Sequence, residues 1–190
     1  MRQKFGALLA TLILALSDFS AAANAIEEEQ RADNIFVTPG AEASFHLEED
    51  GSLILISGGA AQLSAFEARA ARHYVGAQPP SAPVPNADVI SAEDAGYPAP
   101  NEIARDQLTV RLVQALDAPD MILIIENGYD KALRYHAVLH AGSRSARTDV
   151  CIIPPGRYGF EHWPFAFEAV ELYSFELSDW RDGDPIPCTE

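Results

Sequence analysis

Between residues 108 and 179 the chain is divided into short apolar or alternating segments, with turn-forming residues at about every 8–15 positions. Apolar and polar residues alternate over 108–112 and again over 133–139, which is the pattern of a strand with one buried face. The segment from Met121 to Ile125 is uniformly apolar, as expected of a central strand covered on both faces. The pattern predicts a mainly β fold, a small antiparallel β-sandwich that is Ig-like in general architecture.

A β-hairpin is expected before this region. Alternation over 43–47 and an apolar run over 53–56 flank Asp50-Gly51, a pair suited to a tight turn. The glycine pair at 58–59 is expected to end the second strand.

One short helix is expected after the hairpin, over about 65–75. Ser64 and Glu67 have the spacing of a capping box, in which the side chain of each accepts a backbone N–H of the other. The next 31 residues, 77–107, contain six prolines between Pro79 and Pro100 and are expected to form an extended connector.

The chain begins with the pattern of an export signal. Basic residues precede the apolar stretch 5–16, and small residues at 23 and 25 predict cleavage before Ile26. The apolar stretch is shorter than the ~20 residues that span a bilayer, so no transmembrane segment is expected after cleavage. The organisation is thus a leader (1–25), a hairpin plus helix (26–76), a Pro-rich connector (77–107) and a β-sandwich (108–190), in a periplasmic or secreted protein.

The two cysteines, Cys151 and Cys188, are expected to form one disulfide, because the predicted compartment is oxidising. They do not form the Cys-X-X-Cys pattern of a redox-active pair, so a structural bond that ties the C-terminal tail is favoured.

The charge of the chain excludes several partners. It has 13 basic and 28 acidic residues, a formal net charge of −15. Nucleic acids and anionic lipids are recognised through Lys and Arg, so neither is expected as a partner. Hydrophobic residues make up 48% of the chain, which excludes disorder of the whole.

Four aromatic residues are candidates for a binding patch: Tyr129, Tyr158, Phe160 and Trp163. Exposed aromatic rings over a rigid sheet bind sugars or partner proteins, whereas in a small domain such residues more often pack in the core. Tyr129 follows Asn127-Gly128, which is expected to connect strands 121–126 and 132–139 through a tight reversal with positive φ.

Enzymatic motifs are absent from the sequence. No nucleophile elbow, phosphate-binding glycine loop or dinucleotide fingerprint occurs, so no catalytic or cofactor-binding residue is assigned. Paired acids near Trp163, namely Glu161 and Glu168, leave a small hydrolase as an alternative.

Metal binding is the third possibility, and no ligand residue is assigned. His136 and His140 have a zinc-like spacing only on a helix, because four residues along a strand extend about 13 Å. Asp179, Asp182 and Asp184 lie near a glycine, but their order does not match a known calcium loop.

The last ~70 residues resemble small secreted bacterial proteins of no assigned function. The resemblance is carried by four stretches: 125–129, 148–151, 158–164 and 183–188. It implies a structural unit with a disulfide-tied tail and brings no catalytic residues. We therefore expect an exported β-sandwich that is a non-enzymatic binding or envelope-associated module, with a periplasmic or envelope protein as its partner and an oligomeric state that the sequence leaves open.

Overall fold

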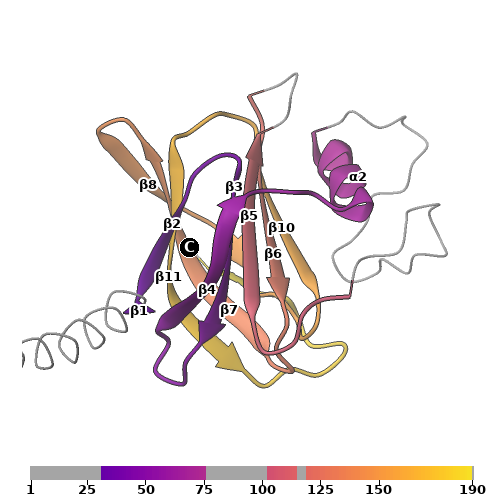
Figure 1. Ribbon diagram of the computed structural model, residues 1–190. Coiled ribbons are helices and arrows are strands. Elements are labelled where there is room, and N and C mark those ends of the chain that lie inside the picture. The colour runs from indigo at the N-terminus through magenta and orange to yellow at the C-terminus, as the bar shows by residue number, and fades with distance from the viewer. Residues whose placement is uncertain (1–30, 76–101, 115–118, 190) are drawn as a thin grey trace, which may run out of the picture.

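The computed structural model describes residues 31–75, 102–114 and 119–189, whose strands form two packed antiparallel sheets and a separate two-stranded ribbon (Figure 1). The mainly β class and the small sandwich are confirmed, whereas the Ig-like architecture stays a prediction. The leader 1–25 and most of the Pro-rich connector lie outside the described residues. Within the described ranges, no helix has the length and apolarity needed to cross a membrane.

The larger sheet has six strands in the order β1-β4-β3-β5-β6-β10. Their bounds are Arg31–Ala32 (β1), Leu53–Ala60 (β4), Ala41–Leu47 (β3), Leu108–Gln114 (β5), Met121–Asn127 (β6) and Tyr158–Trp163 (β10). The predicted hairpin is β3 and β4, and it joins the later strands edge to edge because β3 also pairs with β5. The glycine pair at 58–59 does not end the second strand, since both glycines remain paired with β3.

The smaller sheet has four strands in the order β2-β11-β7-β8. Their bounds are Asn34–Val37 (β2), Ala169–Ser178 (β11), Ala132–Ala141 (β7) and Arg144–Thr148 (β8). Strand β11 contains a β-bulge, because its register with β7 shifts between Tyr173 and Glu176. Ser174 in this bulge has a φ of 54°.

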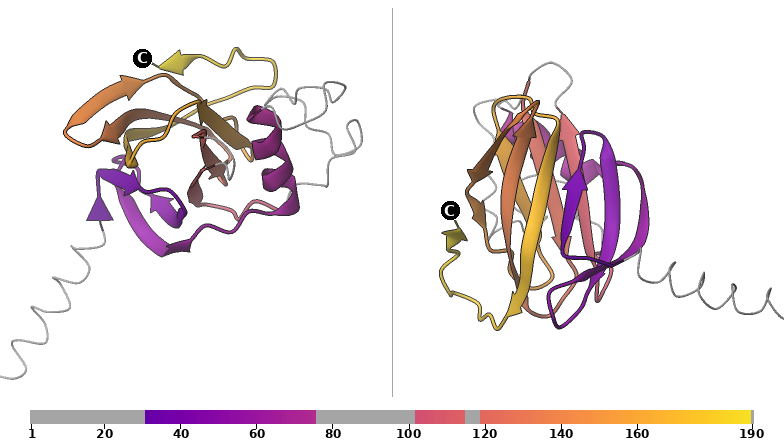
Figure 2. Two further views of the ribbon diagram at one scale, coloured as in Figure 1. Left: turned by 90° about the horizontal axis from the view of Figure 1, so that it is seen from above. Right: turned by 90° about the vertical axis from the view of Figure 1, so that its left-hand side faces the viewer.

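The core lies between the two sheets and extends to the outer face of the larger one. All seven residues of β6 are buried, which confirms the prediction for the apolar run 121–125 and extends burial to Glu126 and Asn127. Leu123 and Ile125 face inward and belong to the core between the two sheets. Ile122 and Ile124 face outward and pack beneath a helix. That helix, α2 (Ala65–Tyr74), lies against the larger sheet (Figure 2).

The capping box of α2 is confirmed. The backbone N–H of Glu67 donates to the Ser64 hydroxyl over 3.2 Å, and the backbone N–H of Ser64 donates to the Glu67 carboxylate over 2.8 Å. Two exposed backbone donors at the start of the helix are thereby satisfied, which fixes where the helix begins.

The disulfide between Cys151 and Cys188 is also confirmed, with the two Cα atoms 3.9 Å apart. It joins β9 (Val150–Cys151) to β12 (Cys188–Thr189), which pair as a separate two-stranded ribbon. The C-terminal tail is thus held by both the covalent bond and backbone pairing.

The connection after β6 differs from the expected tight reversal. It joins β6 to β7, but these strands belong to different sheets, and neither Asn127 nor Gly128 has a positive φ. A glycine is needed at 128 because another backbone segment approaches it closely. A Cβ there would lie 1.9 Å from the carbonyl oxygen of Ala104. The chain crosses between the sheets beneath the segment that leads into β5.

A candidate binding cavity beside the helix

A cavity of about 640 Å³ lies where β6 ends and β10 begins. Four separate segments surround it: the first turn of α2, the segment before β5, the crossover after β6 and the turn before β10. Its volume is within the range of small-ligand and peptide sites. We call it the helix-side cavity.

One wall of the helix-side cavity is aromatic and apolar. Phe66 of α2 lies 5.2 Å from Tyr158 and 6.3 Å from Phe160, measured between ring centroids. Ile103 packs against the same cluster. Tyr158 and Phe160 face the outer side of the larger sheet because alternate residues of β10 point there. The helix α2 shields their rings from water only in part.

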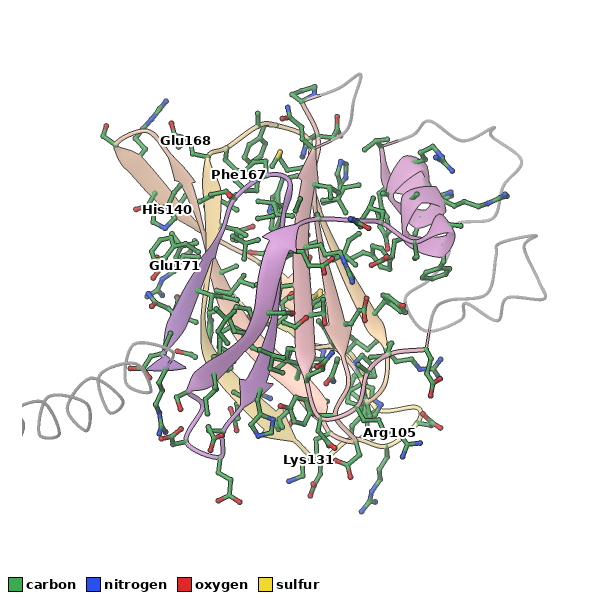
Figure 3. The ribbon with its side chains drawn as sticks, in the orientation of Figure 1. Arg105, Lys131, His140, Phe167, Glu168 and Glu171 are labelled. Carbon is green, nitrogen blue, oxygen red and sulfur yellow. A yellow bond between two sulfur atoms is a disulfide. The ribbon has the colours of Figure 1, made fainter. Side chains whose placement is uncertain are left out.

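The rim of the cavity carries charges of both signs. Arg105 and Arg157 are exposed, as are the acids Glu102, Asp106 and Asp130. Arg105 and Lys131 both lie at this end of the molecule (Figure 3). An apolar wall with a rim of mixed charge suits a ligand that has an apolar group flanked by polar or charged groups.

Asn127 holds the rim in place, and the sequence reading missed this role. Its side-chain amide donates to the carbonyl oxygens of Lys131, Ile153 and Pro154 over 2.9–3.1 Å. Its side-chain oxygen accepts the backbone N–H of Tyr129 over 3.1 Å. A fully buried amide that uses all these bonds fixes two loops at once, so Asn127 is a positioning residue rather than a turn former.

Three of the four predicted patch residues line this one cavity: Tyr129, Tyr158 and Phe160. Trp163 does not line it. Its side chain is buried on the inner face of β10, where the indole N–H donates to Thr148 Oγ1 over 2.8 Å. Strand alternation separates Trp163 from its neighbours, since Tyr158 and Phe160 point to the opposite face.

Tyr129 is largely buried and has an anchoring role. Its hydroxyl accepts the backbone N–H of Leu47 over 2.7 Å and lies 3.3 Å from His46 Nδ1. Burial raises the pKa of Tyr129, so its hydroxyl is neutral across the physiological range.

Beneath α2, next to the cavity, one arginine is surrounded by three carboxylates. Arg111 donates to Glu67 over 2.8 Å and also to Glu42 and Glu126. We call this group the Arg111 cluster. Burial lowers the pKa of Arg111 in isolation, but the three carboxylates together raise it above its ordinary value. The cluster ties α2 to β3, β5 and β6, and so fixes the wall that Phe66 contributes.

Tyr158 connects the cavity to this cluster. It is the cross-strand neighbour of Glu126. Burial and the negative charges of Glu126 and Glu67 raise the pKa of Tyr158 well above its usual value. Its hydroxyl therefore remains a neutral hydrogen-bonding group at the base of the aromatic wall.

The two acids considered for hydrolysis lie in different environments. Glu161 points to the inner side of the larger sheet, where its Oε1 accepts the backbone N–H of Cys151 over 2.8 Å and lies 3.4 Å from the Tyr135 hydroxyl. Burial raises the pKa of Glu161 to about 7. Glu168 is exposed, and its backbone N–H donates to the carbonyl of His140.

Three of the five residues considered for metal binding have other partners. His136 stacks on Tyr173, and His140 Nε2 lies 3.0 Å from Glu171 Oε2. Asp184 accepts the backbone N–H of Arg181 over 2.9 Å. Over the part of the chain that the structure describes, no group of three His, Cys, Asp or Glu side chains is arranged to hold a metal ion.

Comparison with known proteins finds no matching family model, no matching curated protein and no matching solved structure. The residues of the helix-side cavity are therefore the basis for assigning a function.

Proposed function

We propose that this protein is a non-enzymatic binding module, exported from the cell, and that the helix-side cavity receives a short peptide segment of a periplasmic or envelope protein. The observation that carries the proposal is the cavity itself: its aromatic wall and its charged rim come from four separate segments of the chain. The aromatic wall stands on β10 and on a capped helix, and Asn127 holds two of the loops at the rim, which favours binding without rearrangement.

A peptide fits this chemistry better than a small apolar molecule. An apolar side chain of a peptide packs against Phe66 and Phe160, and its charged neighbours find partners of the opposite sign on the rim. Arg105 and Arg157 bind carboxylates, whereas Asp106 and Asp130 accept hydrogen bonds from Lys, Arg or backbone N–H groups.

The test is a selection of peptides from a random heptapeptide library on the purified mature protein. Peptides that bind the wild-type protein should lose about tenfold or more in affinity on Phe160→Leu and several-fold on Arg157→Ala. Phe165→Leu is the matched control, because Phe165 is an aromatic residue that is 49% exposed and does not line the cavity. Peptides that bind all three variants like the wild type would contradict the proposal.

The alternative, a small hydrolase, rests on Glu161 alone. A partly buried carboxyl with a pKa of about 7 is suited to proton transfer at neutral pH. Turnover of a glycoside or ester substrate that Glu161→Gln abolishes would favour the enzyme over the binding module.

Export is part of the proposal and has its own test. The disulfide and the finding on helices within the described residues are compatible with a periplasmic or extracellular protein. Mass spectrometry of protein from the periplasmic fraction should find a chain that begins at Ile26. A chain that retains Met1 in the cytoplasm would contradict it.

A further inference from the structure

The outer face of the smaller sheet carries a group of aromatic and polar side chains on three adjacent strands. In the antiparallel register, Glu171 of β11 pairs with Phe36 of β2, and Tyr173 pairs with Asn34. Alternate residues such as Ile35 and Leu172 are buried, so Phe36, Glu171 and their outward neighbours face away from the core. We call Asn34, Phe36, His140, Glu171 and Tyr173 the open-face platform.

Phe36 is the first unusual feature of the platform. Its side chain is 59% exposed, more than any other large hydrophobic residue among those described. The ring lies 5.4 Å from the His140 ring at an interplanar angle of 53°, so one neighbour steadies it. A large aromatic ring held on a rigid sheet with its surface open to solvent is a ready stacking surface for a ligand.

A hydrogen-bonded chain lies beside this ring. Asn34 Nδ2 donates to Glu171 Oε1 over 2.6 Å, and Glu171 Oε2 lies 3.0 Å from His140 Nε2. Figure 3 shows His140 and Glu171 together on the side formed by the smaller sheet. The three side chains fix one another's rotamers, and each keeps hydrogen-bonding capacity for a further group.

A hollow of about 490 Å³ continues the platform toward the bulge in β11. Asn34, Glu171 and Tyr173 line it, together with Ser174, whose φ of 54° belongs to the bulge. Bulges turn side chains out of the regular ladder and are common beside binding sites. The hollow therefore adjoins the hydrogen-bonded chain, with which it shares Asn34 and Glu171, and the ring of Phe36 lies outside it.

We propose that the open-face platform is a second binding site and that its ligand is an uncharged, hydroxyl-rich oligosaccharide. A sugar ring presents a face of C–H groups that packs on an aromatic ring, and an edge of hydroxyls that both donate and accept hydrogen bonds. Phe36 supplies the first partner, and Asn34, Glu171 and His140 supply the second. The platform extends across three adjacent strands, so it suits an extended chain of sugars rather than a single one.

The proposal is independent of the helix-side cavity, which lies on the opposite outer face of the sandwich. If both sites function, the molecule links a glycan on one face to a protein segment on the other. Either site can fail its test without affecting the other.

The experiment uses the mature full-length protein with two soluble probes, the tetrasaccharides of N-acetylglucosamine and of glucose, followed by calorimetry and NMR. At least one probe should bind the wild-type protein. Phe36→Ala should weaken that binding by about tenfold or more, and Glu171→Gln by several-fold. Ile56→Ala is the control, because Ile56 is similarly exposed, at 53%, on β4 of the larger sheet.

Three results would overturn the proposal. One is the absence of binding of both probes up to roughly 10 mM, a weak-affinity limit for such ligands. Another is unchanged binding by Phe36→Ala, whose fold is checked by circular dichroism and thermal unfolding. The third is loss of binding by Phe160→Leu with retention by Phe36→Ala, which would place the sugar in the helix-side cavity.

Discussion

Carboxylates that are fully or partly buried lie on both sides of the larger sheet, and they differ in whether an arginine is bonded to them. On the outer side, Glu67 and Glu126 share the guanidinium of Arg111 beneath α2. On the inner side, Glu161 accepts hydrogen bonds from Cys151 and Tyr135, and no arginine or lysine of the described ranges forms an ion pair with it. Burial raises the pKa of both Glu126 and Glu161, and only Glu126 has an arginine that opposes this effect.

The difference shows how one cation changes the role of buried acids. Hydrogen bonds from Arg111 join three acids on α2, β3 and β6, and so hold the helix to the sheet. Without a cation, Glu161 has a pKa of about 7 and changes its charge near neutrality. The Arg111 cluster has a structural role, whereas the charge of Glu161 is sensitive to pH.

The largest loss of stability is expected when Arg111 is removed, because the carboxylates around it then lack a cation, as Glu161 does. Arg111→Met removes the only positive charge of the Arg111 cluster and leaves its buried acids uncompensated. Chemical denaturation at pH 7 should show a loss of roughly 3–5 kcal/mol in the free energy of unfolding. Arg134→Met is the control, because its pair with Glu176 is exposed and should contribute less than about 1 kcal/mol. Equal losses for the two variants would refute the role of the cluster.

The disulfide lies next to Glu161, which accepts the backbone N–H of Cys151, and its removal is expected to have the next largest effect on stability. Replacing both Cys151 and Cys188 by Ala frees a 37-residue loop in the unfolded chain, which lowers stability by roughly 3–4 kcal/mol. The released tail should also admit water to Glu161 and lower its pKa toward the ordinary value. Calorimetry measures the first change, and carboxyl NMR titration measures the second. A Glu161 pKa that stays near 7 would mean that the tail does not shield it.

Glu161→Gln tests the pH dependence of stability. Its effect on the free energy of unfolding should be smaller than those of the two changes above. The folded-state pKa of about 7 exceeds the ordinary value of 4.5, so the folded protein binds this proton more tightly. The resulting stability is fully present below about pH 4.5 and is lost as the pH rises through 7. Unfolding at pH 4, 6 and 8 should therefore show the Gln variant more stable than the wild type only at the higher values, by roughly 2–3 kcal/mol at pH 8. If the free energies of unfolding of the two proteins differ by the same amount at all three pH values, the raised pKa of Glu161 is contradicted.

The smallest effect is expected from Tyr135→Phe, which removes the hydroxyl that approaches Glu161 at 3.4 Å. That contact favours the ionised carboxylate, so its loss should raise the pKa of Glu161 slightly, with a stability loss of about 0.5–1 kcal/mol. NMR titration of the Glu161 carboxyl measures the change. Tyr173→Phe, on the outer face of the smaller sheet, should leave the pKa of Glu161 unchanged.

The sequence predicted those elements whose cause is local. The capping box depends on two residues three positions apart, and β6 on an uninterrupted apolar run. Strand β8 was missed because Arg144–Thr148 is almost wholly exposed and shows no apolar alternation. Strand β10 was missed because aromatic residues occupy both of its faces. Alternation reports which face is buried, but not which strand lies alongside, so the crossover between β6 and β7 was mistaken for a tight reversal.

The candidate site was predictable in part. Aromatic residues near one another in sequence identified Tyr158 and Phe160, but Trp163 differs from them by strand parity and points into the core. The Arg111 cluster had no signal in the sequence, because Glu42, Glu67 and Glu126 come from three distant segments. Phe66 and Ile103 reach the cavity only through the packing of α2 and of the chain before β5.

The most direct test of the account is NMR shift mapping with a selected heptapeptide on the mature protein. If the helix-side cavity is the binding site, the largest changes will be at Ile103, Arg157 and Phe160, and Trp163 will not respond. Largest changes on the outer face of the smaller sheet, or changes that persist in Phe160→Leu, would contradict the central claim that the cavity beside α2 is where this protein binds its partner.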